Sequence, residues 1–344
     1  MATKASTKVV AGAQARYTQL QTSRSTALER ARSNSKLTIP GLIPDDGQDS
    51  QATFEQPWQS LGARAVNNLA SWLLITLFPP DQMFFRMSVH EDVAKDLGEG
   101  LSTVKEGLAR IGSKAQLLIE TSACRPVFME ALRHLIVGGN CLLYYPLEPG
   151  PPRMFRLDQY VCLRDERGEL IEAVVKEKVY PSTLDEATIA ACKVDVEPGK
   201  ENNKLVELYT HVRREGDQML HYQEINKVLV PGSEGRSPRG QAGWMALRWQ
   251  AIPGSDYGRA HVSEYIGDLL SLEDLSKSIV QFAAVAARII NVVDPNAMID
   301  VEELNAAETG DYVTGYADKI QTLGLDKGQD FTVANTVAEK IELR

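Results

Sequence analysis

The sequence predicts an α+β fold, with helices first, an antiparallel sheet in the middle and one long helix after the sheet. Apolar residues recur at the helical period of 3.6 up to Val137, and from Cys141 they recur at the period of 2 that marks strands. The stretch Tyr257–Asn291 contains no proline and reads as a single helix about 50 Å long. With 344 residues the chain is long enough for two or three domains.

Four helices are predicted before the sheet. They span residues 11–33, Pro57–Phe78, Glu91–Glu120 and Arg125–Val137. Pro57 stands in the first turn of the second helix, where proline is favoured, and Pro79-Pro80 ends that helix. A short strand is expected over Phe84–Val89. The loop between the first two helices contains Asp45, Asp46 and Asp49, but it lacks the ligand spacing of a calcium loop and is predicted to be solvated.

The middle of the chain predicts seven strands. They span Cys141–Pro146, Met154–Leu157, Tyr160–Arg164, Leu170–Val179, Leu205–Arg213, Met219–Ile225 and Ala246–Ile252. Hairpin turns are expected at Asp165–Gly168 and Arg214–Asp217, because both stretches carry turn residues between alternating runs. A short helix over Leu184–Lys193 interrupts the strands, and Pro231–Gly243 is expected to be a loop.

The long helical stretch changes character along its length. Up to Ser278 only one face is apolar, whereas from Ile279 to Ile290 nearly every face is. Such a helix must be covered all round. The run is about a dozen residues and contains Gln281 and Arg288, so it is too short for a membrane, which needs about 20 apolar residues.

Two other covers remain, a large protein core or neighbouring copies of the same chain. Alanines among the large side chains allow close approach, and we favour neighbouring copies. The residues expected at this contact are Ile279, Phe282, Ala283, Ala286, Ala287 and Ile290.

Beyond the long helix, Asp294-Pro295 is a firm stop. The segment Asn296–Asp330 predicts a short helix over Val301–Ala307 and extended pieces near Tyr312–Thr314 and Lys319–Leu323. Phe331–Arg344 is again helical. The sequence stops within this helical pattern, and we therefore expect it to end before the natural protein does.

The amino-acid composition limits the partners and the cellular compartment that we expect for this chain. The net charge is -9, so the chain is not expected to grip DNA through its phosphates, although an acidic protein can surround a duplex that slides past it. The four cysteines are scattered and indicate buried free thiols in a reducing compartment. The N-terminal stretch has no apolar core typical of a signal peptide. These features predict assembly in the cytosol.

No motif of catalysis stands out. Gly107–Lys114 resembles a phosphate-binding loop, but its order is Gly-Ser-Lys and it lies within a helical pattern. The histidines and carboxylates show no spacing typical of a nucleophile or an acid–base pair. Trp244 and Trp249, near Arg239 and Arg248, could stack on bases, but packing within the sheet is favoured. We predict a structural protein with no catalytic, metal or cofactor site; a nuclease or nucleotide hydrolase is the rival from another class.

One family resemblance runs from about residue 36 to residue 340. Glu55–Ser71, EQPWQSLGARAVNNLAS, resembles the first helix signature of the head-to-tail connector, or portal, proteins of short-tailed bacteriophages (podovirus type). Further similar motifs follow in order along the chain: Leu77-Phe78-Pro79, Val137–Asn140, Tyr209–His211, Asp256–Arg259, Glu264–Leu269, Thr309–Gly315 and Asp330–Ala334.

The resemblance implies a subunit of a ring, usually a dodecamer, at one vertex of the capsid. Residues 1–256 would form an α+β wing, 257–293 the first stem helix, 294–330 a small clip, and 331–344 the start of a second stem helix. Members of that family continue through a tunnel loop, another long helix and a helical crown. If the resemblance holds, this sequence lacks them.

The resemblance also implies partners. The clip would contact the packaging motor, called terminase, and later the tail adaptor; the candidate contacts are Asp311, Tyr312, Tyr316 and Lys319. The major capsid protein and the scaffold would surround the ring, double-stranded DNA would pass through it without sequence-specific binding, and no membrane would be involved. The mature location would be the virion, after assembly in the host cytoplasm. The alternative is a monomeric phage scaffold or adaptor without a channel.

Overall fold

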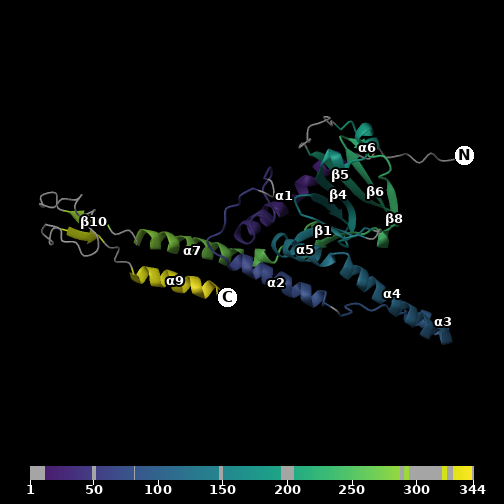
Figure 1. Cartoon of the computed structure of the whole chain (residues 1–344), viewed down its shortest axis with the longest axis horizontal. Coiled ribbons are helices and arrows are strands. Elements are labelled where there is room, and N and C mark those ends of the chain that lie inside the picture. The colour runs from purple at the N-terminus through teal and green to yellow at the C-terminus, as the bar shows by residue number, and fades with distance from the viewer. Residues whose placement is uncertain are drawn as a thin grey trace. The chain divides into compact units, whose positions relative to one another are not determined.

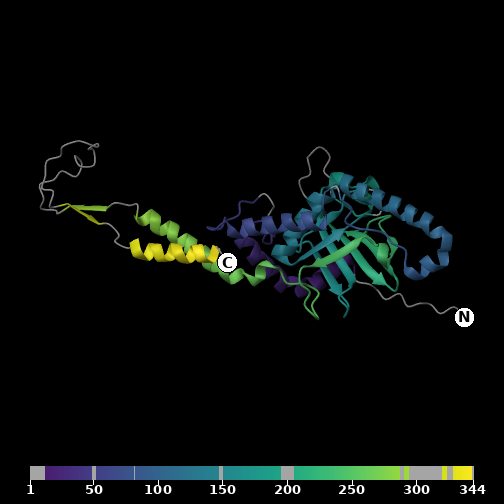
Figure 2. The same cartoon turned by 90° about the horizontal axis from the view of Figure 1, so that it is seen from below.

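The structure is a computed structural model that describes residues 12–48, 52–80, 82–146, 150–194, 205–286, 290–293, 320–323 and 328–342 (Figures 1 and 2). The chain divides into two compact units. The first unit comprises Met1–Gln56 and Gly62–Ile266, and the second comprises Pro57–Leu61 and Gly267–Arg344.

The first unit begins with helices, as predicted, but the second of them starts at Leu61, so the prediction that Pro57 stands in its first turn is wrong. These are α1 (Ala13–Leu37), α2 (Leu61–Leu77), α3 (Glu91–Leu97), α4 (Leu101–Thr121) and α5 (Cys124–Gly138). The single helix predicted over Glu91–Glu120 is wrong, because a short 3-10 turn at Gly98–Gly100 separates α3 from α4. Gly98 has a φ of 49°, which glycine tolerates and a continuous helix does not.

The strand predicted over Phe84–Val89 is also wrong. Residues 82–90 are described and form no strand. Their aromatic and polar groups instead hold the segment against helices: the Phe84 ring lies 5.2 Å from that of Phe78, and the Gln116 amide of α4 donates to the Gln82 carbonyl at 3.0 Å.

The described part of the first unit also contains nine strands and the short helix α6 (Glu186–Ala191). The strands are β1 (Asn140–Tyr144), β2 (Arg153–Phe155), β3 (Tyr160–Arg164), β4 (Leu170–Val179), β5 (Val206–Glu215), β6 (Gln218–Ile225), β7 (Val228–Leu229), β8 (Gly235–Pro238) and β9 (Trp244–Arg248). The predictions for β3 and β4 are confirmed to the residue. Two short strands, β7 and β8, were not predicted; β8 lies within the expected loop Pro231–Gly243.

All the strand pairs described in this unit are antiparallel. A small sheet has the order β2-β1-β9, and a larger sheet has the order β3-β4-β5-β6-β7, with β8 paired to β6. Register is set by runs such as Asn140↔Arg248 to Tyr144↔Trp244. The fold is therefore α+β, as predicted.

The main core lies between the two sheets. Leu142 of β1 and Phe155 of β2 cluster with Tyr160 and Cys162 of β3 and with Val175 of β4. Residues alternate between the faces of a strand, so the neighbours of these side chains in sequence point the other way.

Helices cover the two outer faces. Ala131 of α5 clusters with Cys141 and Leu143 of the small sheet, and Tyr17 of α1 clusters with Val174 of the large sheet. Helix α1 then passes from this outer face to the main core and to α5: Ala27 and Ala31 belong to the core cluster, and the Asn34 amide donates to the Val137 carbonyl of α5 at 2.9 Å. The four cysteines are buried and free, which confirms the prediction of unpaired thiols.

Buried polar groups fix α1 on the large sheet. The Glu224 carboxylate accepts the backbone N–H of Ala13 at 2.7 Å, which satisfies an open donor at the start of α1. Arg16 Nη2 donates to Oε2 of Glu172 in β4 at 2.7 Å, and Oε1 of the same carboxylate lies 2.7 Å from His211 Nε2. These contacts link residues up to 211 positions apart in sequence.

The second unit holds the long helix, which is shorter than predicted. It is α7 (Ile266–Ala286), and it is followed by β10 (Ile290–Val293), which pairs antiparallel with β11 (Ile320–Leu323). A last helix, α9 (Gly328–Glu342), follows. The predicted extended piece over Lys319–Leu323 is thereby confirmed, whereas Val301–Ala307 and Tyr312–Thr314 lie outside the described residues.

The predicted helix over Tyr257–Asn291 fails at both ends. Tyr257 is buried in the main core of the first unit, where its hydroxyl accepts the backbone N–H of Cys162 at 3.0 Å. At the other end the chain turns to the strand β10. None of the described helices is both long enough and apolar enough to cross a membrane.

Candidate subunit interface

Helix α7 is covered in its first half and open in its second half. Leu269 and Leu272 are buried, and Leu272 is fully so. From Ile279 to Ala284 every residue is partly or largely exposed, and Val280 is 49% exposed. An apolar helix surface that its own chain leaves open calls for another molecule to cover it.

The covered half of α7 is held by the segment just before α2, which belongs to the same unit. The Glu273 carboxylate accepts the backbone N–H of Trp58 at 2.9 Å and that of Gln59 at 3.3 Å. A carboxylate that accepts two backbone donors fixes the direction of the chain at Pro57–Leu61. Figures 1 and 2 both show α9 running beside α7.

The structure locates only some of the predicted contact residues. Ile279 and Phe282 lie partly buried on α7, and Ala283 is exposed. Ala286 is the last residue of α7, but its side chain lies outside the description, as does the whole of Ala287. The prediction that Ile290 lies on the helix is wrong: it belongs to β10 and pairs with Leu323, because its β-branched neighbours favour a strand.

The predicted clip contacts cannot be placed. Asp311, Tyr312, Tyr316 and Lys319 all lie outside the described residues.

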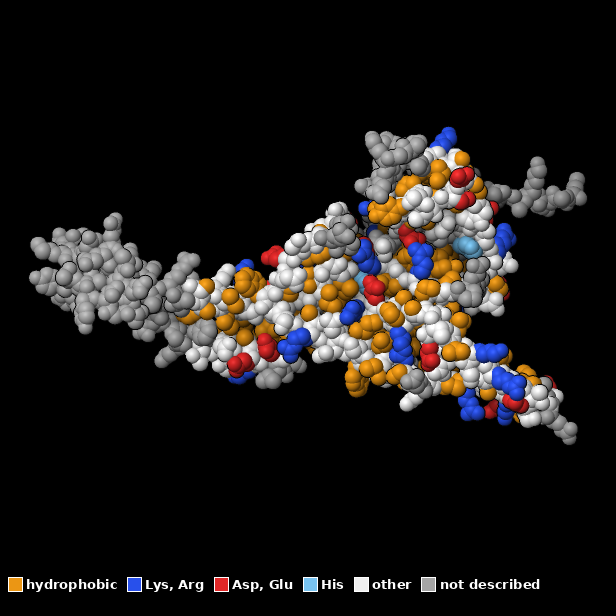
Figure 3. All heavy atoms as spheres, in the orientation of Figure 1, with side chains coloured by type: hydrophobic (Ala, Val, Ile, Leu, Met, Phe, Trp, Pro, Cys, Tyr) orange, Lys and Arg blue, Asp and Glu red, His pale blue; other side chains and the backbone are white. Residues whose placement is uncertain are grey.

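Sequence reasoning missed a second exposed apolar surface, on α2 and α4. Trp72 is 72% exposed, and the buried residues of α2 are Gly62, Val66 and Ala70. The signal was present in the sequence, because the end of α2, WLLITL, is apolar on more than one face, as in α7. Figure 3 shows hydrophobic side chains gathered around the end of α2.

The side chains that were considered for base stacking instead make contacts within the protein. The Trp244 ring stacks on Tyr144 at a centroid distance of 4.3 Å, and Arg248 donates to the Ser255 carbonyl at 2.9 Å. Arg239 pairs with Glu169. This confirms the preference for packing within the sheet.

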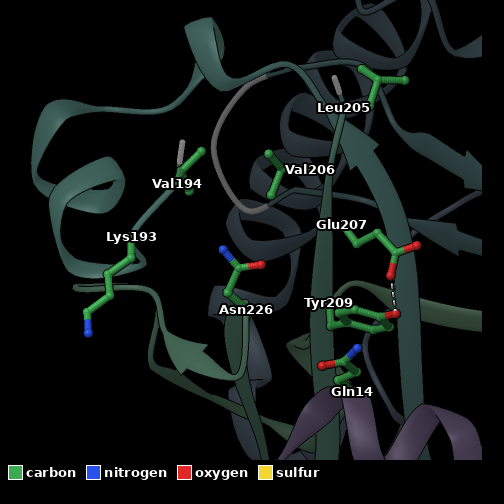
Figure 4. Close-up of a pocket in the computed structure, with 8 residues that line it drawn as sticks. All are labelled: Gln14, Lys193, Val194, Leu205, Val206, Glu207, Tyr209 and Asn226. Carbon is green, nitrogen blue, oxygen red and sulfur yellow. Dashed lines mark hydrogen bonds between the residues drawn. The ribbon is translucent and has the colours of Figure 1, made fainter. Parts of the chain in front are cut away.

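One cavity of about 290 Å³ opens beside the large sheet (Figure 4). Its lining is made of Gln14, Lys193, Val194, Leu205, Val206, Glu207, Tyr209 and Asn226. The Tyr209 hydroxyl donates to Glu207 at 2.7 Å, and Lys176 pairs with the same carboxylate at 2.6 Å. Burial opposes ionisation of Glu207, but these two hydrogen bonds outweigh burial and lower its pKa. The carboxylate is therefore engaged rather than free to act as a base.

The described residues hold no cluster of three or more His, Cys, Asp or Glu side chains that could bind a metal ion. The stretch Gly107–Lys114 lies inside α4, so it does not form the strand–loop–helix arrangement of a phosphate-binding loop.

The chain matches one protein family and is similar to several known proteins. The family described as bacteriophage head to tail connecting protein matches residues 10–342. The chain is 36% identical over 343 residues to a portal protein of Escherichia phage T7, covering 97% of this chain and 63% of that protein. It is 36% identical over 342 residues to a portal protein of Enterobacteria phage T3, with the same coverage.

A chain in the solved virion of a native gene transfer agent particle aligns over 64% of this chain and 53% of its own length, at 12% identity and a TM-score of 0.31. The chain spans less than two thirds of the length of the T7 and T3 proteins. The family match covers residues 10–342 of the chain's 344 residues. The chain therefore belongs to the family of bacteriophage head to tail connecting proteins.

Proposed function

We propose that this chain builds the portal of a phage particle: a ring at one capsid vertex through which DNA is packaged and ejected. The observation that carries the proposal is the family match over residues 10–342, together with relatives that are themselves portal proteins. The proposed role is structural, and no chemistry is assigned to the chain.

Within the ring, the first unit corresponds to the wing, which we propose over residues 1–256. The stem segment is proposed over 257–293, with α7 as its regular helix, the clip over 294–330 and the start of the second stem helix over 331–344. The order of α7, β10, β11 and α9 supports the sequence of stem, clip and second stem helix, since two helices flank a small antiparallel pair. The regular helix available to the stem begins at Ile266.

Neighbouring copies meet, in this proposal, along the open half of α7. A cyclic ring uses a head-to-tail contact in which one face of a subunit meets a different face of the next. The small exposed side chain of Ala283 allows helices to approach closely there. The sequence predicts the same role for Ala286 and Ala287.

The remaining partners follow from the portal role. The clip, with Asp311, Tyr312, Tyr316 and Lys319, is proposed to contact terminase and then the tail adaptor, and the ring is proposed to sit among capsid and scaffold proteins. A dodecamer assembled in the host cytoplasm and retained in the virion is the expected product. The net charge of -9 suits a channel in which a duplex must slide.

The experiment is assembly of the purified chain, observed by native mass spectrometry. The wild-type chain is expected to form closed rings, and Ala283→Glu or Ala286→Glu is expected to shift the population toward single chains, because a buried charge at the contact is left unpaired. Asp274→Asn, a change on the first half of α7, serves as the control. Unchanged rings in both alanine variants would reject the placement on α7. A wild-type chain that stays single would favour the monomeric adaptor.

A further inference from the structure

The chain that leads from the sheets of the first unit into α7 is the segment Asp256–Tyr265, which we call the anchor segment. The structure describes this segment throughout; it contains one 3-10 turn, at Val262–Glu264, and it belongs to no strand of either sheet. A connection of this kind is mobile unless its backbone groups are bonded elsewhere. The partners of the anchor segment therefore decide whether α7 is attached to a fixed point or to a loose one.

The Asn140 side chain takes the place of a neighbouring strand for the anchor segment. Its Oδ1 accepts the backbone N–H of Gly258 at 2.7 Å, and its Nδ2 donates to the Gly258 carbonyl at 3.1 Å. Nδ2 also donates to the Gly138 carbonyl at 3.2 Å. Asn140 is buried, so an apolar residue in its place would leave these backbone groups without that partner. Position 258 needs glycine, because an added Cβ would lie 2.6 Å from the Gln250 carbonyl oxygen.

This contact joins two of the motifs that carry the family resemblance. The motifs are Val137–Asn140 and Asp256–Arg259, and the two residues that meet, Asn140 and Gly258, are 118 positions apart in sequence. The proposed contact along α7 gives neither motif a role. Their contact with each other gives both motifs a single role, which is to hold the chain just before α7.

The residues on both sides of Gly258 are held by the ends of strands. The Asp256 carboxylate accepts the backbone N–H of Arg164, the last residue of β3, at 2.7 Å. The backbone N–H of Arg259 donates to the carbonyl of Gln250, just after β9, at 2.9 Å, and the two residues form an isolated antiparallel bridge. The first half of the anchor segment is therefore bonded to both sheets.

The second half of the anchor segment is held as far as the residue before α7. The Ser263 hydroxyl accepts a hydrogen bond from the Asn34 amide of α1 at 2.9 Å. The centroid of the His261 ring lies 5.3 Å from that of Trp249 and 5.3 Å from that of Tyr265. Partners thus come from α1, β1, β3 and the residues after β9. A segment held by so many elements opens only when several contacts break together.

We infer that the anchor segment is a rigid mount for α7 that fixes the number of subunits in the ring, with Asn140 as its central positioning residue. The inference rests on the proposed function. A cyclic ring closes at one subunit number only when the rotation from each subunit to the next is fixed. In the proposed ring α7 belongs to the stem and the sheets belong to the wing, so the connection between them must be stiff.

The test compares the full-length wild-type chain with Asn140→Asp. Aspartate has the shape of asparagine, but an ionised carboxylate cannot donate to the carbonyls of Gly138 and Gly258. Amide hydrogen exchange in the anchor segment is expected to become about tenfold faster, while exchange in β4 and β5 stays unchanged and shows that the sheets are folded. Native mass spectrometry is expected to show a shift from rings of one subunit number to several subunit numbers or open arcs.

The matched control is Asn226→Asp. It also removes an amide that donates to a carbonyl, that of Cys192 at 3.1 Å, but Asn226 is exposed and lies outside the anchor segment. This control should leave the exchange of the anchor segment and the subunit number of the ring unchanged.

A second variant keeps Asn140 and separates the mount from the helix. Insertion of Gly-Ser after Tyr265 is expected to give the same mixture of rings and arcs, with exchange at Gly258 unchanged. The same insertion after Gly216, in the β5–β6 turn where an added Cβ would meet no other atom within 4 Å, should have no effect. If Asn140→Asp unfolds the sheets, the insertion variant alone decides.

Two results would overturn the inference and leave the ring in place. One is a single, wild-type subunit number in the insertion variant, or in an Asn140→Asp chain whose anchor segment exchanges faster. The other is unchanged exchange of the anchor segment in Asn140→Asp. A wild-type chain that never assembles would instead refute the proposed function, and the inference would fall with it.

Discussion

Arg24 shows how single residues hold the first unit together. Arg24 lies on the buried face of α1. Its Nη1 nitrogen donates to the Tyr160 carbonyl at 2.8 Å and to the Leu157 carbonyl at 3.0 Å. Replacing Arg24 with Met leaves these buried acceptors without that donor, and we expect a loss of at least about 3 kcal/mol in the free energy of unfolding by urea. Arg30→Met on the exposed side of the same helix should cost less than about 0.5 kcal/mol. Equal losses would contradict the account.

His134 predicts a dependence on pH. It is fully buried in α5, and neither ring nitrogen has a hydrogen-bond partner among the residues described. Burial, helped by the charge of Arg156, lowers its pKa to about 3. Between pH 6.5 and 3 the unfolded chain therefore binds a proton that the folded chain does not, so stability falls by about 1.4 kcal/mol per pH unit as pH decreases.

The matched variant is His134→Leu, which removes the titrating group and keeps an apolar side chain. The wild type should lose about 2 kcal/mol more than the variant between pH 6.5 and pH 5, measured by urea unfolding. This pH range avoids the titration of Glu172. Burial would raise the pKa of Glu172, but hydrogen bonds from His211 and Arg16 lower it to about 2. The contribution of Glu172 to stability is therefore lost only as the pH falls from about 4.5 toward 2. Parallel pH curves for the two proteins would refute the assignment.

At the scale of elements, the junction between α5 and β1 depends on Gly139. Its φ of 74° is left-handed, and an added Cβ would lie 2.6 Å from the Ala260 backbone nitrogen. Gly216 in the β5–β6 turn also has a positive φ, 61°, but open space around it. Gly216→Ala should cost about 1 kcal/mol for the backbone conformation alone, and Gly139→Ala at least about 2 kcal/mol because the clash adds to it. Similar costs in urea unfolding would show that Ala260 can move.

The sequence predicted those elements whose signals are local. The hairpin of β3 and β4 has alternating residues on both sides of a turn closed by Gly168, and its bounds were found to the residue. The division of α3 from α4 was missed because the apolar period continues across Gly98. The end of α7 was missed because β10 is fixed by β11, a strand 30 residues later, and no local pattern reveals that pairing.

The candidate interface was predictable only in part. The residue types after Ile279 predicted a helix that is apolar on nearly every face. They could not predict which half of α7 is covered by its own chain, because the covering segment Pro57–Leu61 lies more than 200 positions earlier. The exposure of Trp72 was missed for the same reason: α2 has apolar residues on several faces, and only tertiary contacts select the buried one. The family assignment came from motifs dispersed along the chain rather than from a local site.

At the scale of the whole molecule, the acidic balance predicts weak contact with DNA. Each phosphate contact adds about 0.9 to the slope of log affinity against log salt, and a channel that lets a duplex slide should make few persistent ones. Fluorescence anisotropy with duplex DNA should therefore show no saturable binding at physiological salt. At low salt the slope should have a magnitude below about 2. A slope near that of a typical DNA-binding protein would contradict the proposed sliding channel.

The central claim is that copies of this chain form a closed ring around a central opening. Electron microscopy of the purified protein, with end views averaged without imposed symmetry, tests it most directly. We predict closed rings with a central opening, built from many subunits of 37.9 kDa. Particles that remain the size of one chain at every concentration, or that form assemblies with no opening, would contradict it.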